Sequence, residues 1–430
     1  MWRRYAEGID EVDLLCAALP TPLLLMAGAY DEVFHIDDTR RLAEEVGAFY
    51  REAGQSDRFA FFVDQAGHCY SLVQARQFVR FTNRWLLGKP ERPVSDLTGA
   101  DFSLDSYDQV RCFPRPDVNM RSLALDRANE LEAARKPNDC AGSKEADRVR
   151  AAAWAISNCG QVPDSPSATV GEPFQIWTHY WQQLLLHTEA GIELPATFVY
   201  PCEGVASALL HLDDRRRNRL LYRDGLLAQT IRFLDRQREG GAVLTVDLRG
   251  WGDSQPAMYP YEMAAWGSTD RCLAYASAAL GDPVMSMRIR DALTALAYLR
   301  SLPQVSPHRI FVSGCGLGAL VALHVAAIDT EIAGSVLWDS LVSFKALLQE
   351  NAYAWSADAF VPNVLLHYDL TDLVRAAAGP VHILGPLDGK GLPLSRCALG
   401  ELNESLPYEA YETYTEPGQV VSAVQKLLFG

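Results

Sequence analysis

Residues 309–323 are Arg309-Ile310-Phe311-Val312-Ser313-Gly314-Cys315-Gly316-Leu317-Gly318-Ala319-Leu320-Val321-Ala322-Leu323. The apolar centre of the first five residues predicts a buried strand. Glycines at every second position from Gly314 to Gly318 predict a turn too tight for side chains. The alanine- and leucine-rich run that follows predicts a helix. Strand, glycine turn and helix in direct succession therefore form the segment from which the fold can be worked out.

The turn has the spacing of a nucleophile elbow, G-x-S-x-G, which exposes a catalytic serine between a strand and a helix. Gly314 and Gly318 occupy the two flanking positions, but the serine position is Gly316, which offers no nucleophile. Cys315 adjoins it, and a thiolate is a competent nucleophile when its pKa is lowered. Because Cys315 is one residue out of register, its side chain would point away from the apex, and a packed cysteine is the favoured interpretation.

An oxyanion pocket does not require the serine. The Leu317 amide and an amide after the third strand, near Leu212, are the candidate donors, and such a pocket would bind a carbonyl or carboxylate without turning it over.

Strands and helices alternate over residues 166 to 430, which predicts an α/β fold with a doubly wound, mostly parallel sheet. In such sheets the chemistry lies at the carboxyl ends of the strands. The clearest helix is predicted over residues 284 to 301. The candidate strands are Ala196–Tyr200, Ser207–His211, Ala242–Asp247, Arg309–Ser313, Gly334–Trp338, Pro380–Leu384 and Tyr411–Tyr414.

Four further segments appear around the elbow in a specific order: residues 242–252 (AVLTVDLRGWG), 288–300 (RIRDALTALAYLR), 363–373 (NVLLHYDLTDL) and 380–388 (PVHILGPLD). With the elbow, they resemble the acetyl-xylan-esterase-like group of α/β-hydrolases over most of residues 190 to 420. The resemblance implies a complete α/β-hydrolase domain over 166–430, hydrolysis of short acyl esters of carbohydrates or small molecules, and no metal or organic cofactor.

The resemblance also assigns the remaining triad positions. The acid of this group follows the strand after the cap region, which is Asp388 here. Its histidine lies in a loop after the last strand, where this chain has Tyr414-Thr415-Glu416-Pro417-Gly418-Gln419, so that Gln419 stands at the histidine position. Of the three triad positions in 166–430, only the acid is retained. Asp339, after the strand that ends at Trp338, is interpreted as a helix cap or a salt-bridge partner.

Residues 1–88 contain a second, partial set of these features. Leu23–Ala27 followed by Asp31 resembles the acid strand, and Phe59–Val63 followed by Gly67-His68 resembles the histidine loop. We interpret 1–88 as the C-terminal part of a first hydrolase unit, joined by a linker with a helix, 89–165, to the second. Asp31 and His68 are then catalytic, since an imidazole held by a carboxylate activates a serine as general base. The alternative is an acidic turn residue and a surface histidine.

Two parallel strands make a poor independent sheet. We therefore expect the strands of residues 1–88 to pack against another sheet edge. The serine that matches Asp31 and His68 is absent from this chain, so the site would be completed by a missing upstream segment, another subunit or an unusual nucleophile. As protein partners we expect a homo-oligomer or a missing upstream domain.

Composition excludes several classes of partner. The chain of 430 residues has a net charge of −15, which disfavours nucleic acid. No window approaches the apolar length of a membrane span or a signal peptide, so as the chain stands we expect a cytoplasmic protein. Its nine cysteines include no C-x-x-C pair and indicate neither a disulfide framework nor a zinc site.

Two functional hypotheses follow. One is a carboxylic ester hydrolase that uses Asp31 and His68. The other is a catalytically inactive pseudo-hydrolase, in which the domain over 166–430 serves as a binding or assembly partner.

Overall fold

A computed structural model of the chain describes residues 3–90, 94, 98, 105–112, 118–135, 143–163, 166–215, 217, 221, 225–234, 240–257, 267–350, 352–406, 408–414 and 416–429. The chain divides into two compact units, which we call the N-terminal unit (Arg4–Pro116) and the C-terminal unit (Asp117–Gly430, with Met1–Arg3). Among the described residues, none of the helices combines the length and the apolarity that crossing a bilayer requires.

The N-terminal unit contains one small parallel sheet with helices packed against it. Its two strands pair in register from Leu23 opposite Phe59 to Gly28 opposite Asp64, and within the described residues neither strand pairs with any other. The described chain therefore supplies no further sheet edge to these strands, and the expectation that they pack against one stays a prediction for a partner chain. The elements are α1 (Glu11–Cys16), β1 (Leu23–Gly28), α2 (Ile36–Glu52), η1 (Ser56–Arg58), β2 (Phe59–Asp64), α3 (Leu72–Trp85) and α4 (Tyr107–Val110).

The C-terminal unit is built on a ten-stranded sheet in the order β12-β11-β10-β9-β7-β8-β6-β5-β3, with β4 paired to β5. Neighbours from β8 through β7, β9, β10 and β11 to β12 are parallel, and β3 to β6 form an antiparallel extension. The strands are β3 (Ser167–Val170), β4 (Phe174–Ile176), β5 (His179–Glu189), β6 (Ile192–Pro201), β7 (Ala206–Asp213), β8 (Gly241–Val246), β9 (Val305–Cys315), β10 (Gly334–Trp338), β11 (Val381–Leu384) and β12 (Tyr411–Glu412).

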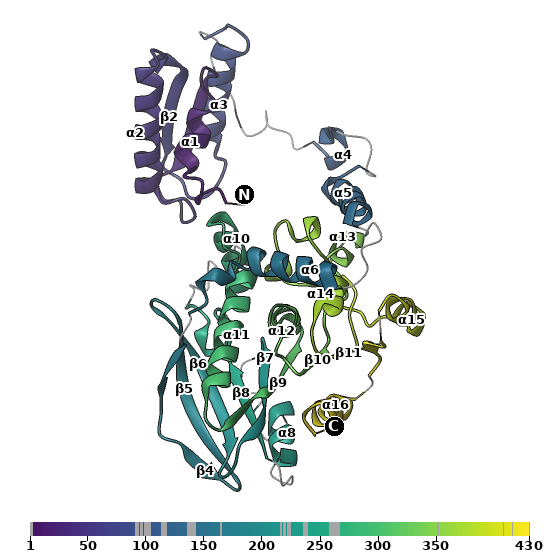
Figure 1. Ribbon diagram of the computed structural model, residues 1–430. Helices are drawn as coiled ribbons and strands as arrows, with labels where there is room; N and C mark the ends of the chain where they lie inside the picture. The colour runs from purple at the N-terminus through teal and green to yellow at the C-terminus, as the bar shows by residue number, and fades with distance from the viewer. Residues whose placement is uncertain are drawn as a thin grey trace. The chain divides into compact units, whose positions relative to one another are not determined.

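Helices cover both faces of this sheet (Figure 1), as a parallel sheet requires. The α/β class and the doubly wound sheet expected from the sequence are confirmed. The main helices are α5 (Met120–Arg135), α6 (Ser143–Ile156), α8 (Leu226–Leu234), α10 (Thr269–Ala279), α11 (Val284–Ser301), α12 (Leu317–Ile328), α13 (Ala346–Gln349), α14 (Leu370–Ala376), α15 (Arg396–Glu404) and α16 (Pro417–Phe429).

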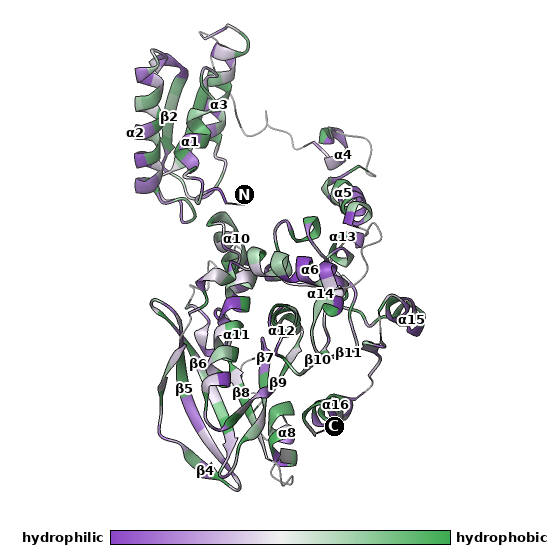
Figure 2. Cartoon of the chain, viewed as in Figure 1, coloured by the Kyte–Doolittle hydropathy of each residue, from purple (hydrophilic) through white to green (hydrophobic). Residues whose placement is uncertain are grey.

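Successive residues of the central strands face opposite layers. Along β7, Leu210 and Leu212 join the core cluster that includes buried residues of α11, α12 and α14, whereas Leu209 joins the cluster formed with α8 and α16. Helix α12 is predominantly hydrophobic (Figure 2) and buries every residue from Leu317 to Ala327. An apolar helix of this kind can only form the centre of a layered core.

The C-terminal unit extends further toward the N-terminus than residue 166. Helix α6 lies within the segment 89–165 and packs against α12 and α14, with Val149 and Ala153 buried in the main core cluster. Its first residues, 143–148, are helical although their sequence, SKEADR, is typical of a loop. The segment has the low hydrophobicity of a loop, but tertiary packing on one side of the helix stabilises it.

The glycines of the elbow are required by contacts between β7, β9 and α12. A Cβ on Gly318 would lie 2.2 Å from the Leu212 carbonyl oxygen, and one on Gly314 would lie 2.5 Å from the Gly318 carbonyl oxygen. Backbone atoms cannot rotate away as a flexible side chain can. Only hydrogen at these positions allows the helix to start against the strands.

We predict that Gly318→Ala lowers the free energy of unfolding by about 3 kcal/mol, the upper range for an overpacked core. Gly400→Ala is the matched control, because this glycine lies inside α15 with nothing within 4 Å of an added Cβ. There alanine should stabilise by about 0.5–1 kcal/mol. Urea denaturation of both variants checks the difference, and equal effects would contradict the close approach.

Candidate functional site

The elbow lies at the carboxyl edge of the parallel sheet. Gly316 follows β9 and precedes α12, with φ 56° and ψ −121°. Its amide donates to the Trp338 carbonyl at 3.1 Å, and its own carbonyl accepts from the Ala319 amide at 3.2 Å. The elbow conformation expected from G-x-G-x-G is thus present, with hydrogen in place of the side chain that carries the nucleophile.

An acidic side chain faces the apex of the elbow. A Cβ on residue 316 would lie 3.9 Å from Asp214 Oδ2, with no described atom nearer. Burial, reinforced by the charge of Asp213, raises the pKa of Asp214 to about 6. Asp213 itself is buried and accepts from the Arg215 guanidinium at 2.6 and 2.9 Å. Because Arg215 pairs with Asp213, the charge at this place becomes negative once Asp214 ionises, and that charge disfavours a developing oxyanion.

The two expected oxyanion residues have different surroundings. Leu317 is the first residue of α12, where backbone amides point out of the helix. Leu212 lies inside β7 opposite Gly314, and the strand continues to Asp213. The first amide beyond the strand therefore belongs to Asp214, two residues later than the position near Leu212 that the sequence indicated.

Cys315 is buried at the end of β9, and its Sγ lies 3.8 Å from Asp339 Oδ2. Burial and the charge of Asp213 raise the pKa of the thiol above its usual range. A thiol that resists ionisation beside a carboxylate is a poor nucleophile. The geometry therefore supports a packed cysteine.

Tyr414 lies beside Asp339 at the end of β10, the strand that pairs with β9 and so lies next to the elbow. Tyr414 follows β12, and its hydroxyl donates to Asp339 Oδ1 at 2.8 Å. Asp339 directly follows β10 and has a positive φ of 50°, which is rare for a residue with a side chain. Burial and the bond to Asp339 raise the pKa of the phenol. The sequence does not predict this hydrogen bond, because no local pattern links residues that follow two different strands.

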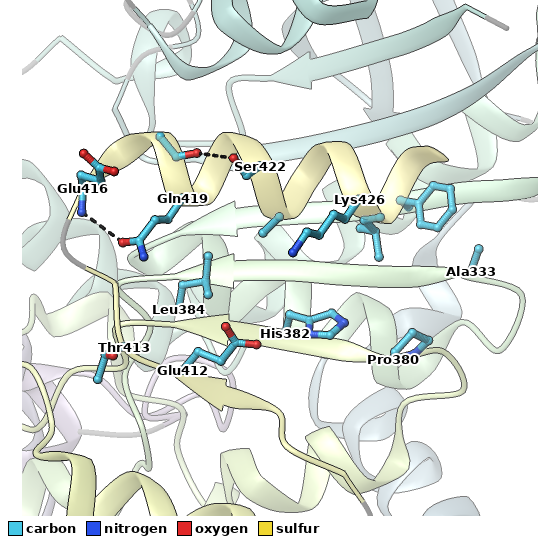
Figure 3. Close-up of a pocket in the computed structure, with 14 residues that line it drawn as sticks. Ala333, Pro380, His382, Leu384, Glu412, Thr413, Glu416, Gln419, Ser422 and Lys426 are labelled. Atoms are coloured by element: carbon cyan, nitrogen blue, oxygen red, sulfur yellow. Dashed lines mark hydrogen bonds between the residues drawn. The ribbon is translucent and has the colours of Figure 1, made fainter. Parts of the chain in front are cut away.

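Gln419 lies in the first turns of α16, and not in the loop that was expected at the histidine position. It lines a cavity of about 840 Å³ between α16 and the sheet (Figure 3), and its Oε1 accepts from the Glu416 amide at 3.3 Å. The helix begins at Pro417, and proline favours the first position of a helix.

Asp388 is held within its own turn. Its Oδ1 accepts from the Lys390 amide at 2.8 Å and the Leu392 amide at 2.9 Å, and its carbonyl accepts from Trp355 Nε1. Its assignment as an acid remains a prediction.

His211 is buried, hydrogen-bonded to Ser313 at 2.8 Å and stacked on Trp338.

The N-terminal unit brings Asp31 and His68 together. Asp31 follows β1, His68 follows β2, and Asp31 Oδ2 lies 3.1 Å from His68 Nδ1. The other carboxylate oxygen accepts from the Val33 amide at 2.8 Å and the Phe34 amide at 2.9 Å. Burial opposes ionisation of Asp31, but these amides and the imidazole outweigh it and lower the pKa of the carboxyl.

In a catalytic pair the orienting carboxylate is buried and the imidazole is accessible to substrate, and Asp31 and His68 differ in this way. The Asp31 side chain is 9% exposed and that of His68 is 49% exposed. Because Nδ1 faces the carboxylate, Nε2 is the nitrogen that can accept a proton from a reacting group. Phe34 packs against the imidazole with ring centroids 5.5 Å apart. A carboxylate that orients an exposed imidazole is the arrangement of a general base.

Comparison with known proteins agrees with this architecture. No family model matches the chain. A sequence named "Putative hydrolase YtaP", from Bacillus subtilis (strain 168), is 27% identical over 212 residues, which cover 47% of this chain and 67% of that protein.

Two solved structures are similar in fold. One is described as a "putative acetyl xylan esterase" from Bacteroides fragilis NCTC 9343; it covers 71% of this chain and 85% of its own, with a TM-score of 0.56 and 15% identity. The other, named Methylesterase BT1017, covers 71% of this chain and 70% of its own, with a TM-score of 0.51 and 17% identity. The chain has the α/β-hydrolase fold, and the resemblance to the acetyl-xylan-esterase-like group is confirmed at the level of fold.

We predict a pH-dependent contribution of Asp214 to stability. Since its pKa of about 6 in the folded protein exceeds the ordinary value of 3.8, the folded state binds this proton more tightly. The free energy of unfolding should fall by about 2 to 3 kcal/mol as the pH rises from about 4 to above 6. Asp214→Asn removes this term.

Urea denaturation at several pH values from 4.5 to 7.5 measures the difference between wild type and Asp214→Asn. Asp126→Asn, an exposed carboxylate on α5, controls for loss of a surface charge. If the free energy of unfolding depended on pH in the same way in wild type and in Asp214→Asn, Asp214 would not be held protonated by its surroundings.

Proposed function

We propose that this protein hydrolyses carboxylic esters with short acyl groups, of carbohydrates or small molecules, with Asp31 and His68 as its acid–base pair. The observation that carries the proposal is the 3.1 Å contact of Asp31 Oδ2 with His68 Nδ1 at neighbouring strand ends. The fold supports the choice of reaction, as do the names of two similar structures, an acetyl xylan esterase and a methylesterase.

In this mechanism His68 Nε2 removes the proton of a hydroxyl group as the hydroxyl oxygen attacks the ester carbonyl. Asp31 stabilises the imidazolium that forms. The imidazolium then protonates the leaving alkoxide as the ester C–O bond breaks. Water then attacks the resulting acyl group, and His68 takes the proton of the water and passes it to the hydroxyl oxygen that is released. One ester and one water thus give one acid and one alcohol.

Hydrolysis of p-nitrophenyl acetate and butyrate tests this role. We expect His68→Ala and Asp31→Asn to lower kcat/KM by about 100-fold or more, the lower end for loss of a general base. His35→Ala, which removes another exposed histidine of the same unit, controls for non-specific attack by surface imidazoles and should have no effect. Cys315→Ala should also retain activity.

Equal activity in His68→Ala and His35→Ala would show that the ester is attacked elsewhere. Absence of hydrolysis by the wild-type protein, purified from the cells that normally produce it together with any bound polypeptide, would favour the second candidate function.

That second candidate is a pseudo-hydrolase role for the C-terminal unit. It is favoured by Gly316 at the apex, which offers no nucleophile, and by Tyr414, whose hydroxyl donates to Asp339. In this role the unit binds or assembles without turnover, and its intact core maintains the shape of the domain.

We predict that Gly316→Ser alone does not create an esterase, since the Asp214 carboxylate that faces residue 316 opposes the negative charge of an oxyanion and Tyr414 holds a protonated phenol. The variant should fold, at a cost of about 1–3 kcal/mol for a side chain at positive φ. Thermal unfolding and p-nitrophenyl acetate turnover measure the two effects. Turnover above that of wild type would reveal a base that the elbow can use.

A further inference from the structure

The N-terminal unit repeats the end of the C-terminal unit in local structure. Helix α1 starts with a capping box in which Asp10 is the N-cap and Asp13 closes the box. Helix α14 starts with the same device, formed by Asp369 and Asp372. Each helix is followed by a proline and then by a strand, β1 or β11.

The repeat continues past these strands. Both β1 and β11 pair in parallel with the next strand, β2 and β12 respectively. After each first strand comes an aspartate whose Oδ1 accepts from the amide two residues later at 2.8 Å, Asp31 in one unit and Asp388 in the other. A long helix closes each unit, α3 or α16. The two segments therefore share one architecture from capping box to last helix.

The C-terminal unit shows what this architecture packs against. The second edge of β11 pairs in parallel with β10, from Ser335 opposite Val381 to Trp338 opposite Leu384. Helix α14 packs against α12, the helix that follows the elbow, and against α6. At the start of this segment, Tyr368 and Leu373 are completely buried.

The same surfaces of the N-terminal unit are open. Ile9 and Leu14 hold the positions of Tyr368 and Leu373 relative to the capping box, and they are 40% and 43% exposed. No residue of α1 is buried, and the first four residues of β1 are only half-buried. Among the described residues β1 pairs with β2 alone, so its second edge has the unpaired backbone groups of an edge strand.

We propose that the second edge of β1 and the apolar side of α1 together form a docking surface for a partner polypeptide with an α/β-hydrolase core. The partner contributes a parallel strand at the place that β10 holds beside β11, and the helix after its elbow at the place that α12 holds beside α14. A second copy of this chain does not fit, because its own β10 edge already pairs with β11.

This docking has a catalytic consequence, which rests on the proposed function. One strand of the partner pairs with β1, and the next strand of the partner ends in a G-x-S-x-G elbow, as β9 does beside β10. The elbow serine then lies at the same sheet edge as Asp31 and His68. Each half then carries what the other lacks: the partner brings the nucleophile, and this chain brings the base and its orienting acid. Burial of Ile9 and Leu14 provides apolar contact area for the complex.

Site-specific photocrosslinking tests the surface in the full-length chain. A benzophenone amino acid replaces Leu14, and in a second variant replaces Leu280, an exposed leucine of the C-terminal unit that serves as control. Both chains are expressed in the cells that normally produce the protein, irradiated and purified. Crosslinked peptides are then identified by mass spectrometry.

We expect position 14, and not position 280, to crosslink to a helix that directly follows a G-x-S-x-G motif in another polypeptide. Leu14→Glu should reduce recovery of that polypeptide at least 10-fold, with the melting temperature of the chain unchanged because Leu14 is exposed. The proposal is overturned if position 14 gives no crosslink above position 280. It is also overturned if the peptide follows no such motif or belongs to a second copy of this chain.

The ester assay separates this outcome from that of the proposed function. An elbow-bearing partner whose complex hydrolyses no ester would leave the docking surface standing and contradict the function. His68-dependent hydrolysis by the chain without any such partner would support the function and contradict the docking surface.

Discussion

The close approach of backbone atoms at the elbow is the constraint on which the C-terminal unit depends. Gly318 lies against the Leu212 carbonyl, and Gly314 lies against Gly318, so that α12 starts in direct contact with β7 and β9. This contact fixes the central helix at the middle of the sheet. The apolar surface of α12 then determines which strand residues form the larger core cluster. The constraint is structural and does not depend on a side chain at residue 316.

The retained elbow therefore explains how the fold can persist without the catalytic serine. The surroundings of Gly316 have side chains of another kind: Asp214 faces the apex, and Tyr414 with Asp339 occupies the flank. Tyr414 and Asp339 satisfy each other by a hydrogen bond, and the raised pKa of Asp214 reduces the charge that is buried there.

The N-terminal unit presents the opposite case. It holds an oriented and accessible imidazole, yet its two-stranded sheet has little core of its own, and only Ala27, Ala43, Val46 and Tyr50 of its elements are buried apolar residues. The capping boxes, the aspartate turns and the paired strands show that it shares its plan with the end of the C-terminal unit. The local structure that the two segments share is the basis of the proposed docking surface.

Local pattern in the sequence determined the alternation of strands and helices from residue 196 onward, the elbow with its missing serine, and the pairing of Asp31 with His68. Each depends on residues close together in sequence, or on two strand ends that parallel pairing must bring to one edge. Strand Gly334–Trp338 and helix 284–301 have the predicted bounds. The antiparallel strands β3 to β5 were not predicted, because β3 and β4 have only 4 and 3 residues and β5 carries consecutive leucines, Leu184–Leu186, in place of an alternation. Only the tertiary structure could place Asp214 against Gly316, Tyr414 on Asp339 and Gln419 within α16, since these positions result from packing between elements far apart in the chain.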